Sequence, residues 1–218
     1  MNRDEVRNRD ETNEIKQQDG IYYPVDKAVG GTWFGFNEHG TVMALLNRYQ
    51  DKQIETEYSR GLIIPTLLKS QNISVELDKF LEKDFNPFDL IIINHIQIIH
   101  CCWNGKELNI STKSYPFFIT SSSIDSHRVL NFRTRKFFDF EAESGRNILT
   151  DLHLIQDIKN TSASIYMSRD ITHTKSISQL CLKSESLNYH YFTEKNLTKL
   201  NKKDPYLQCQ NLSLEIPR

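Results

Sequence analysis

The clearest hydrophobic pattern of the chain lies between residues 30 and 47. Thr32 to Phe36 is rich in β-branched and aromatic residues, and Thr41 to Leu46 includes five consecutive apolar residues. The polar cluster between them, Asn37 to Gly40, offers a glycine for a positive φ, so the pattern predicts a β-hairpin. Because the second strand has no polar face, we expect this sheet to be covered on both faces.

Three glycines and one asparagine stand out in this stretch. Gly30, Gly31 and Gly35 weaken a strand, which indicates a close approach of the backbone to another strand or to a ligand. Asn47 ends the apolar run as a lone polar residue. Its amide belongs either to a turn or to a pocket, and the pattern alone leaves both interpretations open.

Two short helices are predicted after the hairpin. Ser59 can cap a helix that runs to Leu68, and Pro65 limits this helix because proline fits only a first turn. A second helix is expected to begin at Asn72. One apolar stripe runs along it, formed by Ile73, Leu77, Phe80 and Leu81.

Later apolar runs predict strands at residues 90–93, 96–103, 107–110, 117–119, 162–168, 176–182 and 187–192. Asn104-Gly105 predicts a two-residue hairpin turn. A longer helix is expected from about Ser126 to Glu143, and a further short helix at residues 147–156. The longer helix has an apolar side, which includes Phe132, and a basic side that we expect to be solvated: Arg128, Arg133, Arg135 and Lys136. Strands dominate and helices come in blocks, which favours an α+β fold with antiparallel sheets.

Both ends of the chain are polar. Residues 1–20 have the composition of a solvated arm, and the Asn- and Lys-rich stretch after Thr193 shows no periodicity. The pattern therefore predicts one domain over residues 1–192 and a loosely ordered tail over residues 193–218.

Composition narrows the possible partners and compartments. The 218 residues carry a net charge of −1, which gives no reason to expect a nucleic acid partner. No apolar run is long enough to span a membrane, and the charged start has no signal-peptide core. The four cysteines lack zinc spacing, so we expect reduced thiols, no metal site, no cofactor and a cytoplasmic protein.

Three further polar features have a catalytic and a structural interpretation. Ser121 to Ser123 lacks a nucleophile elbow and is better explained as a helix cap. Cys101 and Cys102 lie in an apolar strand and suit a core. His153, between two leucines, is more typical of a structural histidine than of a pocket residue.

Several motifs resemble the NRDE proteins, which are the transport and Golgi organisation 2 family. The similarity covers roughly residues 2–192. Its most specific parts are Asn2-Arg3-Asp4-Glu5, Gly30-Gly31-Thr32-Trp33-Phe34-Gly35, Ala44-Leu45-Leu46-Asn47 and Ser59-Arg60-Gly61.

This resemblance implies a fold and a chemistry. NRDE proteins resemble N-terminal-nucleophile hydrolases, which are four-layer αββα sandwiches of antiparallel sheets. In those enzymes the first residue of the mature chain is Cys, Ser or Thr. Its side chain attacks an amide, ester or thioester carbonyl, and its own α-amino group is the base.

The resemblance also implies roles for single residues. Arg3, Asp4 and Asn47 would support catalysis: Arg3 by holding an anionic group, Asp4 by orienting the α-ammonium group, and Asn47 by donating to an oxyanion. Asn2 and Arg60 would take part in binding. We expect Arg3, Asp4, Asn47 and Arg60 to meet at one end of the sandwich. Arg3 and Asp4 can share a pocket only if their strand ends or bulges there.

The family's first strand and its nucleophile are missing before Asn2, because Met1 directly precedes the tetrad Asn2-Arg3-Asp4-Glu5. We therefore expect that Met1 is not the natural start and that the chain as given is inactive. The first hypothesis is a hydrolase of a small amide, ester or thioester. The alternative is a non-enzymatic lipid- or cofactor-binding or trafficking protein that uses the same cleft. Both imply a small-molecule ligand, and the sequence leaves the oligomeric state open.

Overall fold

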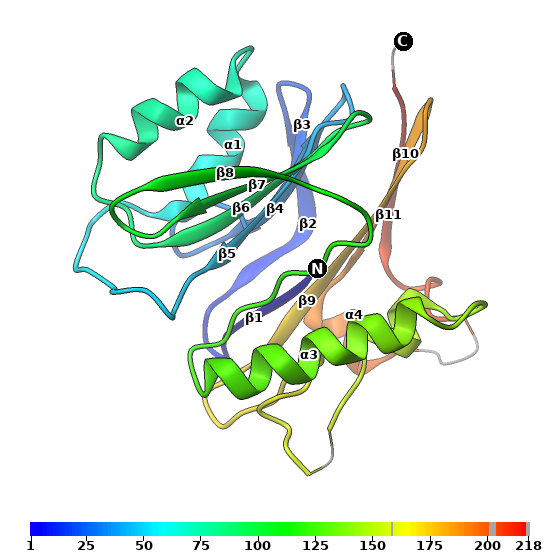
Figure 1. Ribbon diagram of the computed structural model, residues 1–218. Coiled ribbons are helices and arrows are strands. Elements are labelled where there is room, and N and C mark those ends of the chain that lie inside the picture. Colours follow the sequence, from blue (N-terminus) through cyan, green and yellow to red (C-terminus); the bar gives the residue numbers. More distant parts are fainter. Residues whose placement is uncertain (158, 201–203, 217–218) are drawn as a thin grey trace. The chain divides into compact units, whose positions relative to one another are not determined.

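Antiparallel strands provide most of the regular structure in the computed structural model, which describes residues 1–157, 159–200 and 204–216 (Figure 1). The α+β class predicted from the sequence is confirmed. The chain divides into two units. Unit 1 contains residues 1–8, 116–180 and 189–212, and unit 2 contains residues 9–115, 181–188 and the chain from residue 213.

Unit 2 is built on a seven-stranded antiparallel sheet. Each strand pairs with the next one along the chain, although a 3₁₀ turn and two helices lie between the fourth and fifth strands of the sheet. In order, the strands are β2 (Glu11–Gln18), β3 (Ile21–Asp26), β4 (Phe34–Asn37), β5 (Val42–Asn47), β6 (Phe88–Ile93), β7 (Ile98–Trp103) and β8 (Leu108–Lys113).

The predicted hairpin of residues 30–47 is confirmed as β4 and β5, with Phe34 opposite Ala44. Gly40 has a φ of +78°, so the expected glycine makes the turn. Coverage of β5 is less complete than its composition predicts. On one face of the strand Val42 is buried while Ala44 and Leu46 are only partly buried, whereas Met43 and Leu45 on the opposite face are both buried.

Helices close that face of unit 2 (Figure 1). The 3₁₀ turn η1 (Arg60–Leu62) leads into α1 (Ile63–Lys69), and α2 (Ile73–Leu81) follows. The expected caps are present, because Ser59 accepts a hydrogen bond from the Gly61 amide and Asn72 accepts one from Val75. The core between helices and sheet includes Met43, Ile64, Leu67, Leu77 and Phe88.

Unit 1 contains most of a four-stranded sheet in the order β1-β9-β10-β11. The strands are β1 (Asn2–Val6), β9 (Thr172–Leu182), β10 (Ser186–Phe192) and β11 (Gln210–Glu215). The helices are α3 (Ser126–Glu141), a π-helical turn η2 (Leu149–His153) and α4 (Glu194–Thr198). Phe137 and Phe140 of α3 pack on Leu152 and Ile165.

The polar start of the chain is not the solvated arm that its composition predicts. Residues 2–6 form β1, which pairs antiparallel with β9, and residues 11–18 form β2. These segments are stabilised by ion pairs and strand hydrogen bonds rather than by apolar contacts. Arg9, for example, pairs with the carboxylate of Asp26 at 2.7 Å.

Three other predictions about elements differ from the structure. Residues 117–119 form no strand, and residues 162–168 contain only turns and an isolated bridge from Ser168 to His173. The chain after Thr193 includes α4 and β11, although its residues 201–203 and 217–218 lie outside the described part. The prediction of one domain over residues 1–192 stays a prediction.

Within the described ranges, no helix has the length and apolar character needed to cross a lipid bilayer.

Candidate functional site

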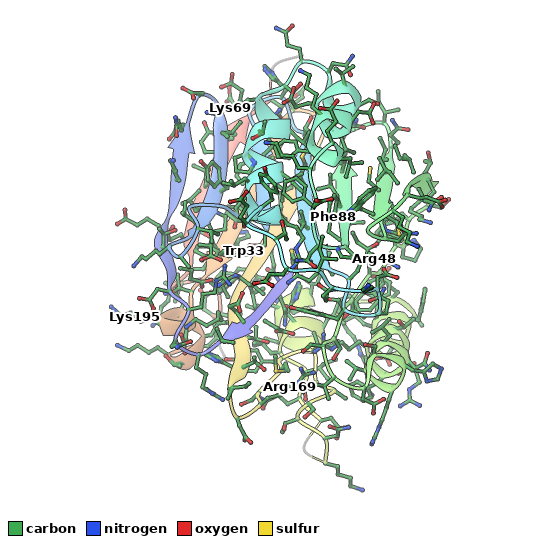
Figure 2. All side chains as sticks on the ribbon, turned by 90° about the vertical axis from the view of Figure 1, so that its left-hand side faces the viewer. Trp33, Arg48, Lys69, Phe88, Arg169 and Lys195 are labelled. Carbon is green, nitrogen blue, oxygen red and sulfur yellow. The ribbon has the colours of Figure 1, made fainter. Side chains whose placement is uncertain are left out.

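Two glycines on different elements shape the end of the sheet in unit 2. A Cβ atom on Gly31 would lie 2.5 Å from the carbonyl carbon of Gly61, so only glycine allows this approach. The Gly61 carbonyl accepts a hydrogen bond from the Thr32 amide at 2.8 Å. The close approach predicted for Gly31 is therefore made to the turn that carries Arg60. Trp33, Arg48 and Phe88 mark this end of the sheet in Figure 2.

Asn47 and Arg60 lie together at this end, with Tyr49 between them. The Asn47 side-chain amide donates to the Tyr49 hydroxyl at 2.9 Å. The Arg60 guanidinium donates to the Pro87 carbonyl at 2.7 Å. Burial lowers the pKa of Arg60, and the nearby Tyr49 side chain partly offsets this. The structure therefore brings together two of the residues that the family resemblance singled out.

Arg60 has no carboxylate partner among the residues that the structure describes. A partly buried cation normally pairs with an anion, because burial removes part of its hydration. Tyr49 is 43% exposed, so solvent and small molecules can reach this cluster. Arg60, Tyr49 and Asn47 thus offer a cation and polar hydrogens to an anionic group.

Arg48, which lies between Asn47 and Tyr49 in the sequence, is held by two carboxylates. Its guanidinium donates to Asp51 at 2.6 Å and to both carboxylate oxygens of Asp89 at 2.9 and 3.1 Å. Burial alone would lower the pKa of Arg48, but hydrogen bonds and charge from Asp51 and Asp89 leave it raised. Asp89 is only 3% exposed and lies on β6, so this ion pair fixes the chain just after Asn47 to the sheet.

A histidine and a cysteine flank the same carboxylate. The His100 ring nitrogen Nε2 lies 2.7 Å from Asp89, and Cys102 is opposite Asp89 in the β6–β7 register. Burial, with the charges of Asp89 and Asp51, raises the pKa of Cys102, so its thiol stays protonated. No group of three or more His, Cys, Asp or Glu side chains within the described ranges is placed to hold a metal ion.

Asn2 of the tetrad is bound within unit 1. Its side-chain nitrogen donates to the carbonyls of His153 and Ile165, both at 2.9 Å. Its oxygen lies 2.5 Å from Nδ1 of His153, which therefore donates to it. Burial lowers the pKa of His153 well below its ordinary value. This geometry agrees with the structural interpretation of His153 and fixes η2 against β1.

Asp4 of the tetrad binds a buried arginine. Its carboxylate accepts from the Thr174 hydroxyl at 2.6 Å and from the Arg133 guanidinium at 3.3 Å. Burial raises the pKa of Asp4, although Arg133 and Arg169 oppose this shift. Arg133 is only 5% exposed. The prediction that Arg133 belongs to a solvated basic face of its helix is therefore wrong.

Arg3 faces away from Asn2 and Asp4. It is 6% exposed, and its guanidinium lies 3.5 Å from Glu5, the next residue on its side of the strand. The pairing of β1 with β9 shifts register between Arg3 and Asp4, and Lys175 is the extra residue. The irregularity thus lies on β9, and β1 keeps its alternation.

The site residues predicted from the sequence therefore belong to two groups. Asn2, Arg3 and Asp4 are in unit 1, whereas Asn47 and Arg60 are in unit 2. The expectation that they meet stays a prediction. Sequence reasoning missed the roles of Tyr49 and Asp89, although Tyr49 lies two residues after the end of the apolar strand and Asp89 is the one charged residue in the apolar run of β6.

Comparison with known families agrees with these motifs. A sequence model described as "Transport and Golgi organisation 2" matches residues 1–204. The chain belongs to this family. The family match includes both the tetrad of unit 1 and the Asn47–Arg60 cluster of unit 2. No curated protein matches the chain.

Proposed function

We propose that this family member binds a small anionic amide, ester or thioester and hydrolyses it, with the Asn47–Tyr49–Arg60 cluster as part of the binding site. The observation that supports this most directly is Arg60, a partly buried guanidinium whose hydrogen bond goes to a backbone carbonyl. Guanidinium groups bind carboxylates and phosphates through paired hydrogen bonds.

The roles of the three side chains follow from their positions. Arg60 would hold the anionic group of the substrate. The Asn47 amide, which donates to the Tyr49 hydroxyl, would donate instead to the oxyanion that develops during acyl transfer. The resemblance implies that the attacking group is the side chain of a first residue Cys, Ser or Thr, so turnover is expected from a mature chain that begins with one of them. The four-layer sandwich of such enzymes belongs to the same proposal.

Binding and turnover can be tested separately. N-acetylglycine carries an amide and a carboxylate, and N-acetylglycinamide lacks the charge. We expect the first to bind the protein about tenfold more tightly in titration calorimetry, which corresponds to about 1.4 kcal/mol. Arg60→Met should remove this preference. Lys52→Met, which removes an exposed cation three residues after Tyr49, should retain it. Equal binding of both probes by the unchanged protein would contradict the role of Arg60.

A hydrolase and a binding protein then differ in turnover. For a hydrolase, Asn47→Ala should lower kcat on amide, ester and thioester substrates more than it changes KM. The alternative is a non-enzymatic protein that carries a lipid or cofactor. Burial raises the pKa of Cys101 and of Cys209 to about 11, so neither of these internal thiols is a candidate nucleophile at neutral pH. In a mature chain that begins with Cys, Ser or Thr, binding that depends on Arg60 without any turnover would establish this alternative. A cytoplasmic location is proposed for either case and is tested by cell fractionation.

A further inference from the structure

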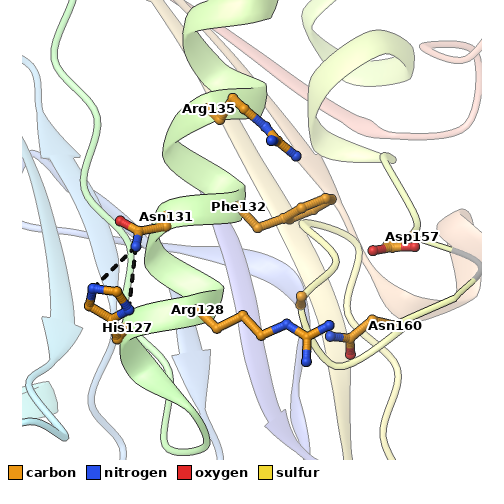
Figure 3. A pocket seen from close by; sticks show the side chains of 8 residues that line it. His127, Arg128, Asn131, Phe132, Arg135, Asp157 and Asn160 are labelled. Atoms are coloured by element: carbon orange, nitrogen blue, oxygen red, sulfur yellow. Dashed lines mark hydrogen bonds between the residues drawn. The ribbon is translucent and has the colours of Figure 1, made fainter.

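A pocket lies within unit 1, between α3 and a side formed by Asp157, Asn160 and Ala163 (Figure 3). Its volume is about 570 Å³. Arg128, Phe132 and Arg135 extend from α3 toward Asp157 and Asn160 (Figure 3). This volume is within the range of sites that take small molecules.

The α3 side of the pocket presents two guanidinium groups with an aromatic ring between them. Arg128, Phe132 and Arg135 are spaced four and three residues apart, which places them on one face of the helix. Neither arginine has a carboxylate partner among the residues that the structure describes. The Lys136 ammonium, which does not line the pocket, lies 5.9 Å from the centre of the Phe132 ring.

The opposite side of the pocket is polar and preformed. The Asp157 backbone amide donates to Ser164 at 2.8 Å, and its carboxylate accepts from the Lys159 amide at 2.9 Å. These bonds hold Asp157 in place and use only one of its two carboxylate oxygens, so the other can accept a hydrogen bond from a ligand. Asn160 adds an amide to the same side. The two arginines against one carboxylate leave the pocket lining positively charged.

We propose that this pocket binds a nucleoside phosphate. The two arginines would bind the phosphate oxygens through paired hydrogen bonds. Phe132 would stack on the base, as aromatic side chains do in many nucleotide-binding proteins. Asp157 would accept a hydrogen bond from a ribose hydroxyl, and Asn160 would bind a polar edge of the base or sugar. The charge selects the phosphate, and the ring selects the aromatic base. This site does not depend on the function proposed for unit 2.

The first test uses ADP as the probe with the full chain. We expect one ADP to bind per chain in titration calorimetry, and chemical shifts of α3 amides to change on binding. Arg128→Met and Arg135→Met should each weaken binding about tenfold, the loss expected when one charged hydrogen-bonding partner is removed. Lys106→Met removes an exposed cation from a turn of unit 2 and should leave binding unchanged. No ADP binding at millimolar concentration, or equal loss in the Lys106 variant, would overturn the site.

A second test separates the two parts of the ligand. Adenosine and inorganic pyrophosphate should each bind at least about tenfold more weakly than ADP, because each makes only part of the contacts that ADP makes. Phe132→Leu should weaken binding of ADP and leave that of pyrophosphate unchanged. Thermal melts of each variant show that it is folded. Pyrophosphate binding as tight as that of ADP would overturn the assignment to a nucleoside phosphate.

Discussion

At the scale of single residues, the contact between Gly31 and Gly61 explains why two distant motifs occur together. Gly31 belongs to the Gly-Gly-Thr-Trp motif, and Gly61 ends the Ser59-Arg60-Gly61 motif. The two backbones touch where the η1 turn approaches the sheet, and the contact places Arg60 beside Asn47. A methyl group added to Gly31 or to Gly61 would therefore disturb the other motif.

Gly31→Ala should therefore destabilise the protein by about 1–3 kcal/mol, as overpacking does, because its Cβ would lie 2.5 Å from the Gly61 carbonyl carbon. Gly61→Ala is the matched control, since its Cβ would lie 3.3 Å from Gly31 and needs a smaller shift. The midpoints of urea unfolding measure both changes. If the two variants lose equal stability, the close approach of Gly31 to Gly61 is not the cause of the destabilisation.

Residue-level prediction from the sequence succeeded for local signals and failed for distant partners. The close approach of Gly31 could be inferred from its position in a strand, but the partner, thirty residues away, could not. Arg133 looks like one of several surface cations, because helical spacing does not reveal a carboxylate 129 residues away. The same reasoning failed for residues 1–20, where ion pairs replace the apolar pattern that marks a strand.

At the scale of elements, Arg133 connects α3 to its surroundings in unit 1. Its guanidinium donates to the carbonyls of Ala163 and Ser164 at 3.3 and 3.0 Å, and to the Asp4 carboxylate of β1 at 3.3 Å. One side chain thus joins the helix, the strand that carries the tetrad and the segment before β9. The tetrad aspartate has a structural role in addition to any role in catalysis.

Arg133→Met should cost about 3 kcal/mol of folding free energy, because it removes the ion-pair partner of the largely buried Asp4 carboxylate. Arg135→Met, an exposed arginine on the same helix, should cost less than about 0.5 kcal/mol. Urea unfolding followed by circular dichroism measures both. Adding Asp4→Asn to Arg133→Met should restore part of the loss, since the uncompensated charge is then absent. A double variant that is no more stable than Arg133→Met would contradict the ion pair as the cause.

Elements with a cap and a periodic apolar stripe could be predicted well from the sequence. Asn72 and the stripe behind it define α2, and the apolar runs around residues 88–103 define β6 and β7. Residues 117–119 and 162–168 have strand-like composition but no strand partner. Composition reports the preference of a side chain, whereas a strand also needs a neighbour for its backbone groups.

At the scale of the whole molecule, the chain passes repeatedly between its two units. The changes occur after residues 8, 115, 180, 188 and 212, which gives five passages. β9, β10 and β11 each contribute residues to both units. Two domains joined by a single linker can each unfold alone. A chain that passes five times between its units differs from that arrangement.

We therefore expect the protein to unfold in one cooperative transition, as the prediction of a single domain implies. Both tryptophans, Trp33 and Trp103, belong to unit 2, so their fluorescence reports on that unit alone. Arg133→Met acts in unit 1. If the units unfold together, this variant should lower the free energy of unfolding by the same amount in two measurements. One is the tryptophan transition, and the other is the protection of α3 amides from hydrogen exchange. A tryptophan midpoint that stays unchanged while α3 loses protection would show that the units unfold independently. Thr32, Trp33 and their neighbours would then form a fold that does not need unit 1, and the single-domain prediction would fail.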